Sequence, residues 1–231
     1  MPRKEQFDFL SYLADIAREE NNSSGDGSAR IPSLTELSEN TGISISKLRE
    51  QLGVARALGL VEVRPRTGIQ LLPFSFGPAV HQSLSYAISC DRHNFDLFAD
   101  LRRHIEANYW FEAVAALTPE DHAYLQELVE KAFTKLNGHP VRVPHQEHRE
   151  LHLTIYGRLQ NPFVLGIMEA YLDAYETVGY SQYSDLDYLK HVWQYHRQIV
   201  EAICDADHQR GYQALLDHMA LIDHIHGTKI E

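Results

Sequence analysis

The feature that most constrains the fold is a long series of helical patterns in the second part of the chain. From Ala79 to the last residue, apolar side chains recur at the three- and four-residue spacing of amphipathic helices, with only short breaks between segments. Thr118-Pro119-Glu120 is typical of a helix start, and Asn137-Gly138 is typical of a stop. The predicted helices span residues 79–90, 93–116, 119–136, 143–159, 161–179, 184–205 and 208–225. So many helices with short connections predict an all-α antiparallel bundle.

The first part of the chain has a different pattern. Ser33 and Glu36 have the spacing of a capping box, and Gly42 is placed to end the helix that they begin. Two β-type runs on either side of Pro-Arg-Thr-Gly predict a hairpin. The predicted elements are a helix over 7–17, a short helix capped by Ser33, a helix from Ser44 or Ser46 to Leu58, and strands over 60–64 and 69–72. This order is typical of a winged helix-turn-helix, so the whole chain is predicted to be mainly α.

Charge and histidine content divide the chain at the same place. Residues 1–75 carry 9 Lys and Arg against 10 Asp and Glu, whereas residues 76–231 carry 12 against 22. All 14 histidines lie at or beyond His81. Residues 73–78, Pro-Phe-Ser-Phe-Gly-Pro, have the composition of a connector. We therefore predict a winged helix-turn-helix DNA-binding domain over 1–75 and an all-α effector-binding and dimerisation domain over 76–231.

Basic residues gather where a winged helix would meet DNA. Five Lys and Arg stand against two Glu between residues 45 and 70. Phosphate contacts supply much of the affinity for DNA, although a net charge of −11 argues against non-specific coating of nucleic acid. The alternative is that these are solvated surface charges. The candidate DNA contacts are Lys47, Arg49, the hydroxyls of Ser33, Ser44 and Ser46, and Arg64 and Arg66 on the wing.

Residues 145–152, His-Gln-Glu-His-Arg-Glu-Leu-His, place histidines on one face of a predicted helix. His148 and His152 are one turn apart and make half of a four-coordinate metal site, with His145 as a possible third ligand. The glutamate spacing of the HExxH and HxxEH zinc hydrolases is absent. The stretch offers ligands without the usual general base, which favours a binding site over a catalytic one.

Motifs along nearly the whole chain occur in an order that resembles one known family. In the first part they are residues 31–37, 42–44, 47–50, 58–61 and 67–68. In the second part they are Arg-Arg-His-Ile-Glu at 102–106, His-Arg-Glu-Leu-His at 148–152, Asn-Pro-Phe at 161–163, residues 196–203 and His218. Together they resemble the GntR transcription regulators of the FadR-type subfamily, whose C-terminal part is the FCD ligand-binding domain.

The resemblance implies a metal inside the helical bundle, held by an acidic residue, the histidine one turn later and two histidines from later helices. Carried onto this sequence, the ligands are His148, His152, His196 and His218. Position 148 usually bears Asp, so His148 makes the site one unit more positive, which favours an anionic effector or a different metal. Zn²⁺ fits neutral imidazoles, and Ni²⁺, Co²⁺ and Mn²⁺ remain open.

Arg102 resembles the pocket arginine of the family, and Glu106 lies one turn later. A guanidinium in the pocket would hold the carboxylate of an effector bidentately while the metal takes the same anion from the other side. An ion pair between Arg102 and Glu106 is the alternative. Both residues are assigned to the effector site.

We therefore predict a ligand-responsive, DNA-binding transcriptional regulator. The resemblance further implies a homodimer on a palindromic operator, with repression as the commoner sign. No apolar run is long enough to cross a membrane and the start is not a secretory signal, so a cytoplasmic location is expected. One alternative is a regulator for which the metal itself is the signal. Another is a metal-dependent helical-bundle enzyme, which would lack a base beside the ligands and leave the winged helix unexplained; no catalytic residue is assigned.

Overall fold

The computed structural model describes residues 7–22, 30–178 and 186–226, with the side chains of 21 and 221–226 left aside. The chain divides into two compact units, Met1–Gln82 and Ser83–Glu231. The division falls within a helix, α4 (Gly77–Cys90), whose first two residues belong to the predicted connector.

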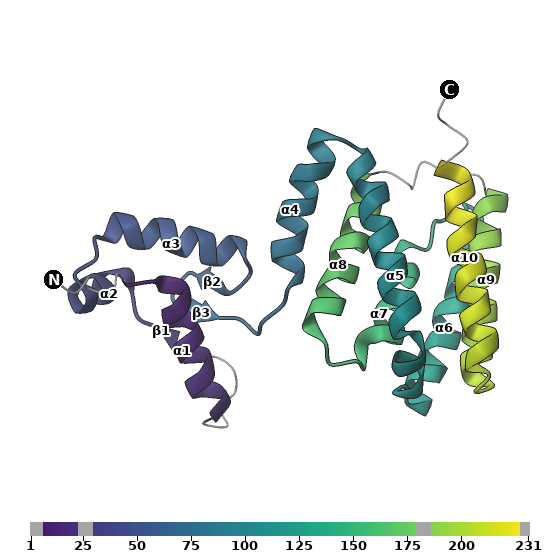
Figure 1. The fold of residues 1–231 in the computed structure, drawn as a ribbon, viewed down its shortest axis with the longest axis horizontal. Helices are drawn as coiled ribbons and strands as arrows, with labels where there is room; N and C mark the ends of the chain where they lie inside the picture. The colour runs from purple at the N-terminus through teal and green to yellow at the C-terminus, as the bar shows by residue number, and fades with distance from the viewer. Residues whose placement is uncertain (1–6, 23–29, 179–185, 227–231) are drawn as a thin grey trace. The chain divides into compact units, whose positions relative to one another are not determined.

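The described residues of the first unit before α4 form three helices and a small sheet (Figure 1). Its elements are α1 (Phe9–Asn22), β1 (Arg30–Ile31), α2 (Leu34–Thr41), α3 (Ile45–Ala57), β2 (Val61–Arg64) and β3 (Gly68–Leu71). The strands are antiparallel in the order β1-β3-β2. The β2–β3 hairpin was predicted, whereas β1 was not, because two residues are too few to show an alternating pattern. Phe9, Leu37, Leu48, Val61 and Ile69 are among the residues of its core.

Local capping explains where α2 and α3 begin and end. Ser33 accepts a hydrogen bond from the backbone N–H of Glu36, and the Glu36 carboxylate accepts one from the backbone N–H of Ser33. Gly42 ends α2 with φ at 71°, a left-handed conformation that glycine adopts without strain. Ser44, rather than Ser46, caps α3. These short-range bonds fix the turn that sets α3 against α2.

The second unit is helical throughout the part that the structure describes, which confirms the predicted all-α bundle (Figure 1). After α4 come α5 (His93–Ala115), α6 (Pro119–Leu136), α7 (His145–Gly157), α8 (Pro162–Thr177), α9 (Leu186–Cys204) and α10 (His208–His226). These bounds agree with the predicted helices to within a few residues. Residue 179 of the predicted helix over 161–179 and residues 184 and 185 of the predicted helix over 184–205 lie outside the described part. Trp110, Leu128, Leu151, Ile199 and Leu215 are core residues from five of these helices. Among the described residues no helix is both long enough and apolar enough to cross a membrane.

Candidate metal centre

Three helices of the second unit bring four histidines together. His148 and His152 come from α7, His196 from α9 and His218 from α10. One ligand atom from each of His148, His152 and His196 can be chosen so that all lie within 4.8 Å of one another. The ring centroid of His218 lies 4.5 Å from that of His196 and 6.3 Å from that of His152. The side chains predicted as ligands are therefore neighbours, although they are spread over 71 positions of the chain, from 148 to 218.

The nitrogens of this cluster lack the partners that buried polar groups normally have. His152, His196 and His218 are buried, and His148 is half-buried. Neither ring nitrogen of His196 or of His218 has a hydrogen-bond partner among the described residues. A buried polar atom without a partner is costly and rare, so these nitrogens are suited to a ligand that accepts their lone pairs. A metal ion bound by imidazoles fits that requirement.

The histidines are also in the protonation state that a metal needs. Burial lowers the pKa of His148 and of His196 well below the ordinary value, and neighbouring histidines lower it further. Burial, with His152 and Arg102 nearby, lowers the pKa of His218 to about 3. Burial also lowers the pKa of His152, although Glu106 opposes this shift. Neutral imidazoles bind metals, whereas imidazolium does not.

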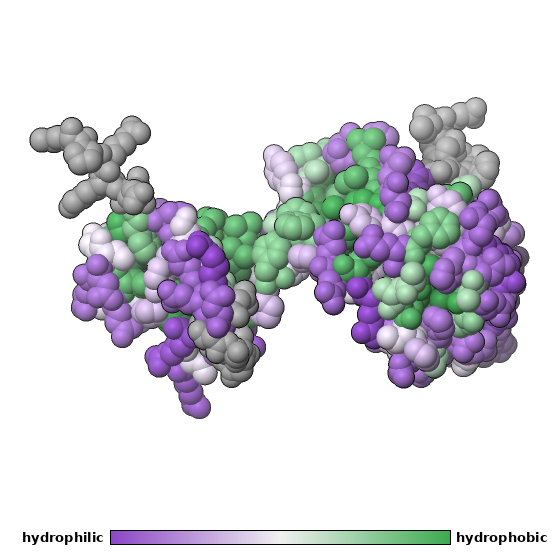
Figure 2. All heavy atoms as spheres, turned by 60° about the horizontal axis from the view of Figure 1, so that its bottom comes forward, coloured by the Kyte–Doolittle hydropathy of each residue, from purple (hydrophilic) through white to green (hydrophobic). Residues whose placement is uncertain are grey.

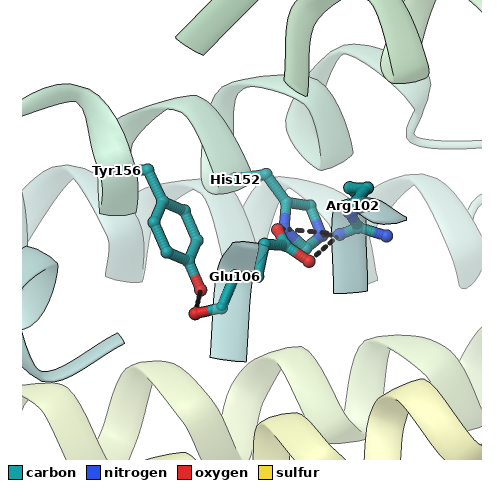
Figure 3. A network of polar contacts seen from close by, with 4 residues as sticks. All are labelled: Arg102, Glu106, His152 and Tyr156. Atoms are coloured by element: carbon teal, nitrogen blue, oxygen red, sulfur yellow. Dashed lines mark hydrogen bonds and ion pairs between the residues drawn. The ribbon is translucent and has the colours of Figure 1, made fainter. Parts of the chain in front are cut away.

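A buried carboxylate holds one of the histidines in place. The Nδ1 atom of His152 lies 2.8 Å from Glu106 Oε1, and Tyr156 donates its hydroxyl proton to the backbone carbonyl of Glu106 at 3.1 Å (Figure 3). Burial alone would raise the pKa of Glu106, but Arg102 and His152 outweigh it and lower the pKa to about 2. When Nδ1–H of His152 donates to this carboxylate, Nε2 keeps the lone pair that a metal would take, and Arg102 Nη2 lies 3.4 Å from that nitrogen.

Arg102 is enclosed by the same network. Its side chain is buried, its Nη2 lies 2.6 Å from Glu106 Oε2, and its guanidinium carbon lies 4.5 Å from the ring centroid of Tyr171. The same Nη2 lies 3.1 Å from Nδ1 of His152. The structure thus contains the ion pair that was the alternative interpretation of Arg102. An effector carboxylate at Arg102 would share the guanidinium with Glu106.

Aromatic residues also surround the cluster. Trp193 packs edge-on against His196, with ring centroids 4.8 Å apart, and the ring centroid of Tyr175 lies 5.4 Å from that of His148. Sequence reasoning did not identify Tyr175, which lies on α8 and has no helical spacing to any of the predicted ligands. The reserve ligand, His145, is half-buried and is not one of the three histidines grouped by ligand distance.

The candidate DNA contacts lie on the first unit, at helix N-termini, on α3 and on the β2–β3 hairpin. Ser33 and Ser44 are helix caps; each accepts a backbone N–H and keeps its own O–H to donate. Arg64 forms an ion pair with Glu62 at 2.8 Å, and Arg66 has φ of 74° in the turn between the strands. Of the candidate contacts, Lys47 is half-buried and the others are exposed: Ser33, Ser44, Ser46, Arg49, Arg64 and Arg66.

Comparisons with known proteins agree on a single group. Residues 98–221 match the FCD domain family, and this range contains all four clustered histidines. An uncharacterized HTH-type transcriptional regulator of Escherichia coli K12, YieP, is 29% identical over 189 residues, which cover 80% of each chain.

Two solved structures share the fold of the chain. GntR of Streptococcus agalactiae has a TM-score of 0.65 at 20% identity and covers 92% of this chain and 97% of its own. McbR/YncC of E. coli has a TM-score of 0.52 at 20% identity and covers 98% and 100%. At these identities the two structures support the architecture of the chain.

Proposed function

This chain belongs to the FCD-domain family of GntR-type transcriptional regulators, and we propose that its helical unit binds a divalent metal and a small carboxylate effector that together control operator binding. The observation that carries the proposal is the cluster of four histidines whose buried nitrogens include four without partners among the described residues. We further propose a homodimer that acts as a repressor on a palindromic operator in the cytoplasm. A two-fold protein matches a two-fold site, since each winged helix reads one half.

The donor set favours a borderline metal. Four imidazoles in a buried site suit Zn²⁺ in tetrahedral coordination, and Ni²⁺, Co²⁺ or Mn²⁺ are the other candidates. All four ligands are neutral, and the charges of Arg102 and Glu106 cancel. A divalent ion would therefore leave the centre with an excess charge of about +2, which an anionic effector would partly neutralise.

The winged helix is the part of the chain that would recognise operator DNA. α3 carries Lys47 and Arg49, and the wing carries Arg64 and Arg66. In helix-turn-helix proteins the second helix of the motif enters the major groove, and basic side chains around it neutralise phosphates. A change in the spacing of the two α3 helices of a dimer would alter how well both fit their half-sites. Effector binding in the helical unit would act on DNA affinity through that spacing.

One observation favours a second function, in which the metal itself is the signal. Arg102 is already paired with Glu106, is stacked on Tyr171 and is buried, so an incoming carboxylate must displace or share an existing partner. The four histidines would complete a tetrahedral coordination shell without any effector. A metal-sensing regulator would change its DNA affinity with metal alone.

The first experiment measures bound metal per chain in protein purified without a His-tag. The comparison is between the parent, a His196→Ala variant and a control, His191→Ala, which removes an exposed histidine from the same helix. We expect about one metal in the parent and the control and none in His196→Ala. Absence of metal from the parent after exposure to Zn²⁺, Ni²⁺, Co²⁺ and Mn²⁺ would overturn the metal site.

A second experiment separates the two functions. Operator binding is measured with metal-free protein, with metal-loaded protein and with loaded protein plus a panel of small carboxylates. A response to a carboxylate only in the loaded state supports effector sensing. A response to metal that no carboxylate modifies supports metal sensing instead.

A further inference from the structure

The first unit contains a pocket that DNA binding does not explain. It has a volume of about 530 Å³ and is lined by nine apolar and two charged residues of the described part. Pockets of this size and lining are typical of sites that enclose a small organic ligand. We call it the α1 pocket; its walls include Leu10, Ala14 and Ala17 of α1 and Leu71, Leu72 and Phe74 at and after the end of β3. Figure 2 shows hydrophobic side chains gathered on the first unit where its chain runs towards α4.

Both walls of the α1 pocket are held by the core of the unit. On one side, Leu13 of α1 is buried in that core. On the other side, the backbone N–H of Leu72 donates to the carbonyl of Leu60 at 2.9 Å, which continues the hairpin pairing past β3. Between them, Ala14 and Ala17 line the pocket with single methyl groups, where longer apolar side chains would occupy the space. The pocket is therefore set by the fold of the unit and left open by two small residues.

The charged residues give the α1 pocket a negative rim. Of the two that line it, Arg18 already donates to Asp15 at 2.7 Å. The other, Glu20, is half-buried and forms no ion pair with another described residue. Glu19 adds an exposed carboxylate beside it, so residues 15–20 carry three acidic side chains against one basic one. A carboxylate at the edge of an apolar wall favours a positive group on the molecule that the wall binds.

We propose that the α1 pocket binds a small apolar cation, such as an ammonium or phosphonium that carries aromatic or aliphatic groups. The apolar walls bind the hydrocarbon part because its transfer from water is favourable. Glu20 pairs with the positive charge. Phe74, which is 55% exposed and also lines the pocket, offers an aromatic ring, and the face of such a ring attracts cations.

This site goes beyond the proposed function. It lies wholly in the winged-helix unit, at residues 10–20 and 60–74, and uses neither the four histidines nor Arg102. Its charge preference is also opposite to that of the metal centre, because Glu20 repels the carboxylate that an effector would bring. Cationic and anionic ligands of the same shape therefore distinguish the two sites.

The test measures binding to the full chain, as purified, by titration calorimetry with two matched pairs of probes. Tetraphenylphosphonium and tetraphenylborate share one shape and carry opposite charges. Decyltrimethylammonium and decanoate form a linear pair, used below their micelle concentrations. We expect the cation of at least one pair to bind at one site per chain. The anion of that pair should bind at least about tenfold more weakly.

Two variants locate the bound cation. Glu20→Gln should weaken cation binding by about threefold or more and strengthen binding of the matched anion. Its control is Glu19→Gln, which removes an exposed carboxylate that does not line the pocket and should change either affinity by less than about twofold. Ala14→Phe fills the pocket and should abolish binding. Ala123→Phe, at an exposed alanine on α6, should leave it intact. Melting temperatures show whether each variant is folded.

Three results would overturn the proposal. The first is that neither cation binds at millimolar concentration. The second is equal or tighter binding of the matched anion. The third is cation binding that survives Ala14→Phe or is lost in His196→Ala, which would place the probe in the second unit. None of them bears on the metal centre, because bound metal is measured separately in the same proteins.

Discussion

At the scale of single residues, Glu106 connects the guanidinium of Arg102 to the imidazole of His152. It is fully buried, lies within hydrogen-bond distance of both Arg102 and His152, and its pKa is lowered to about 2. A buried carboxylate is stable only when such partners replace its hydration. The same contact selects which nitrogen of His152 carries the proton, so the charge balance and the metal-binding geometry depend on one side chain.

Replacing Glu106 by Gln should therefore affect both properties. The amide keeps the shape but leaves Arg102 as an unpaired buried charge, for which a loss of about 3–5 kcal/mol in the free energy of unfolding is expected. Metal affinity should fall about 10- to 100-fold because His152 loses its orienting partner. Denaturant unfolding and titration calorimetry measure the two effects. Glu112→Gln, an exposed position on the same helix, should change neither, and equal metal affinity in both variants would contradict the role given to Glu106.

The lowered histidine pKa values predict how the stability of the metal-free protein depends on pH. The pKa of His218 is about 3 in the folded chain against an ordinary value of 6.5, so between these values the unfolded chain binds a proton that the folded chain does not. The stabilising contribution of neutral His218 is therefore complete above about pH 6.5 and is lost as pH falls towards 3. His148 and His196 shift in the same direction.

Urea unfolding of the metal-free protein at several values between about pH 7.5 and about pH 5.5 tests this dependence, since this range spans about one unit to either side of the ordinary histidine pKa. We expect a free energy of unfolding that decreases with falling pH. His218→Gln should show a shallower decrease, since one titrating group is gone. A profile that is flat over this range would show that the histidines are not buried in the neutral form.

At the scale of elements, the close approach of α10 to α5 decides whether His218 reaches the cluster. A Cβ atom added to Gly211 would lie 2.6 Å from Cζ2 of Trp110, which is nearer than real contacts allow. Trp110 also donates its indole N–H to the carbonyl of His208 at 2.9 Å, at the first turn of α10. His218 follows Gly211 by two helical turns on about the same face. The glycine thus permits the helix spacing that the fourth histidine requires.

Gly211→Ala should push α10 away from Trp110. Overpacking of this kind costs about 1–3 kcal/mol, against which the better helix propensity of Ala returns up to about 1 kcal/mol. Metal affinity should fall because His218 moves with α10. The control is Gly157→Ala on α7, where an added Cβ meets nothing within 4 Å and stability should rise or stay level. An unchanged metal affinity in Gly211→Ala would contradict the role of His218 as a metal ligand.

At the scale of the whole molecule, the acidic and basic residues are unevenly distributed between the two units. The acidic excess lies in residues 76–231, whereas the stretch from 45 to 70 that includes α3 and the wing is locally basic. An acidic second unit is repelled by phosphate, so contact with DNA is directed to the first unit. If the second unit controls DNA binding as proposed, that control is a coupling between two separate sites.

Such a coupling is reciprocal by thermodynamic necessity. If metal, or metal with effector, changes operator affinity by a given factor, operator DNA must change the affinity for that ligand by the same factor. Fluorescence titrations of the ligand with and without operator, beside operator titrations with and without the ligand, measure both factors. Equal factors different from one are expected. Factors of one in both directions would show that the helical unit does not control DNA binding under those conditions.

What the sequence determined by itself is the local part of this structure. The boundaries of α2 and α6 follow from side chains within one helical turn, such as Ser33 with Glu36 and Thr118 with Asp121, and both capping boxes form as their spacing requires. The shared face of His148 and His152 is equally local. His196 and His218 were assigned only through a resemblance, because no local rule joins residues on α7, α9 and α10.

Only the tertiary structure decided which polar groups became buried together. Helical spacing predicts that Arg102 and Glu106 can pair. It does not predict that Tyr171 and His152, which come from other helices, enclose the pair. The two-residue strand β1 likewise exists because β3 offers it a partner. The physical reason is the same in each case. Caps and helical faces depend on the energies of a few neighbouring residues, whereas burial and the resulting pKa shifts depend on how whole helices pack, which is a property of the complete core.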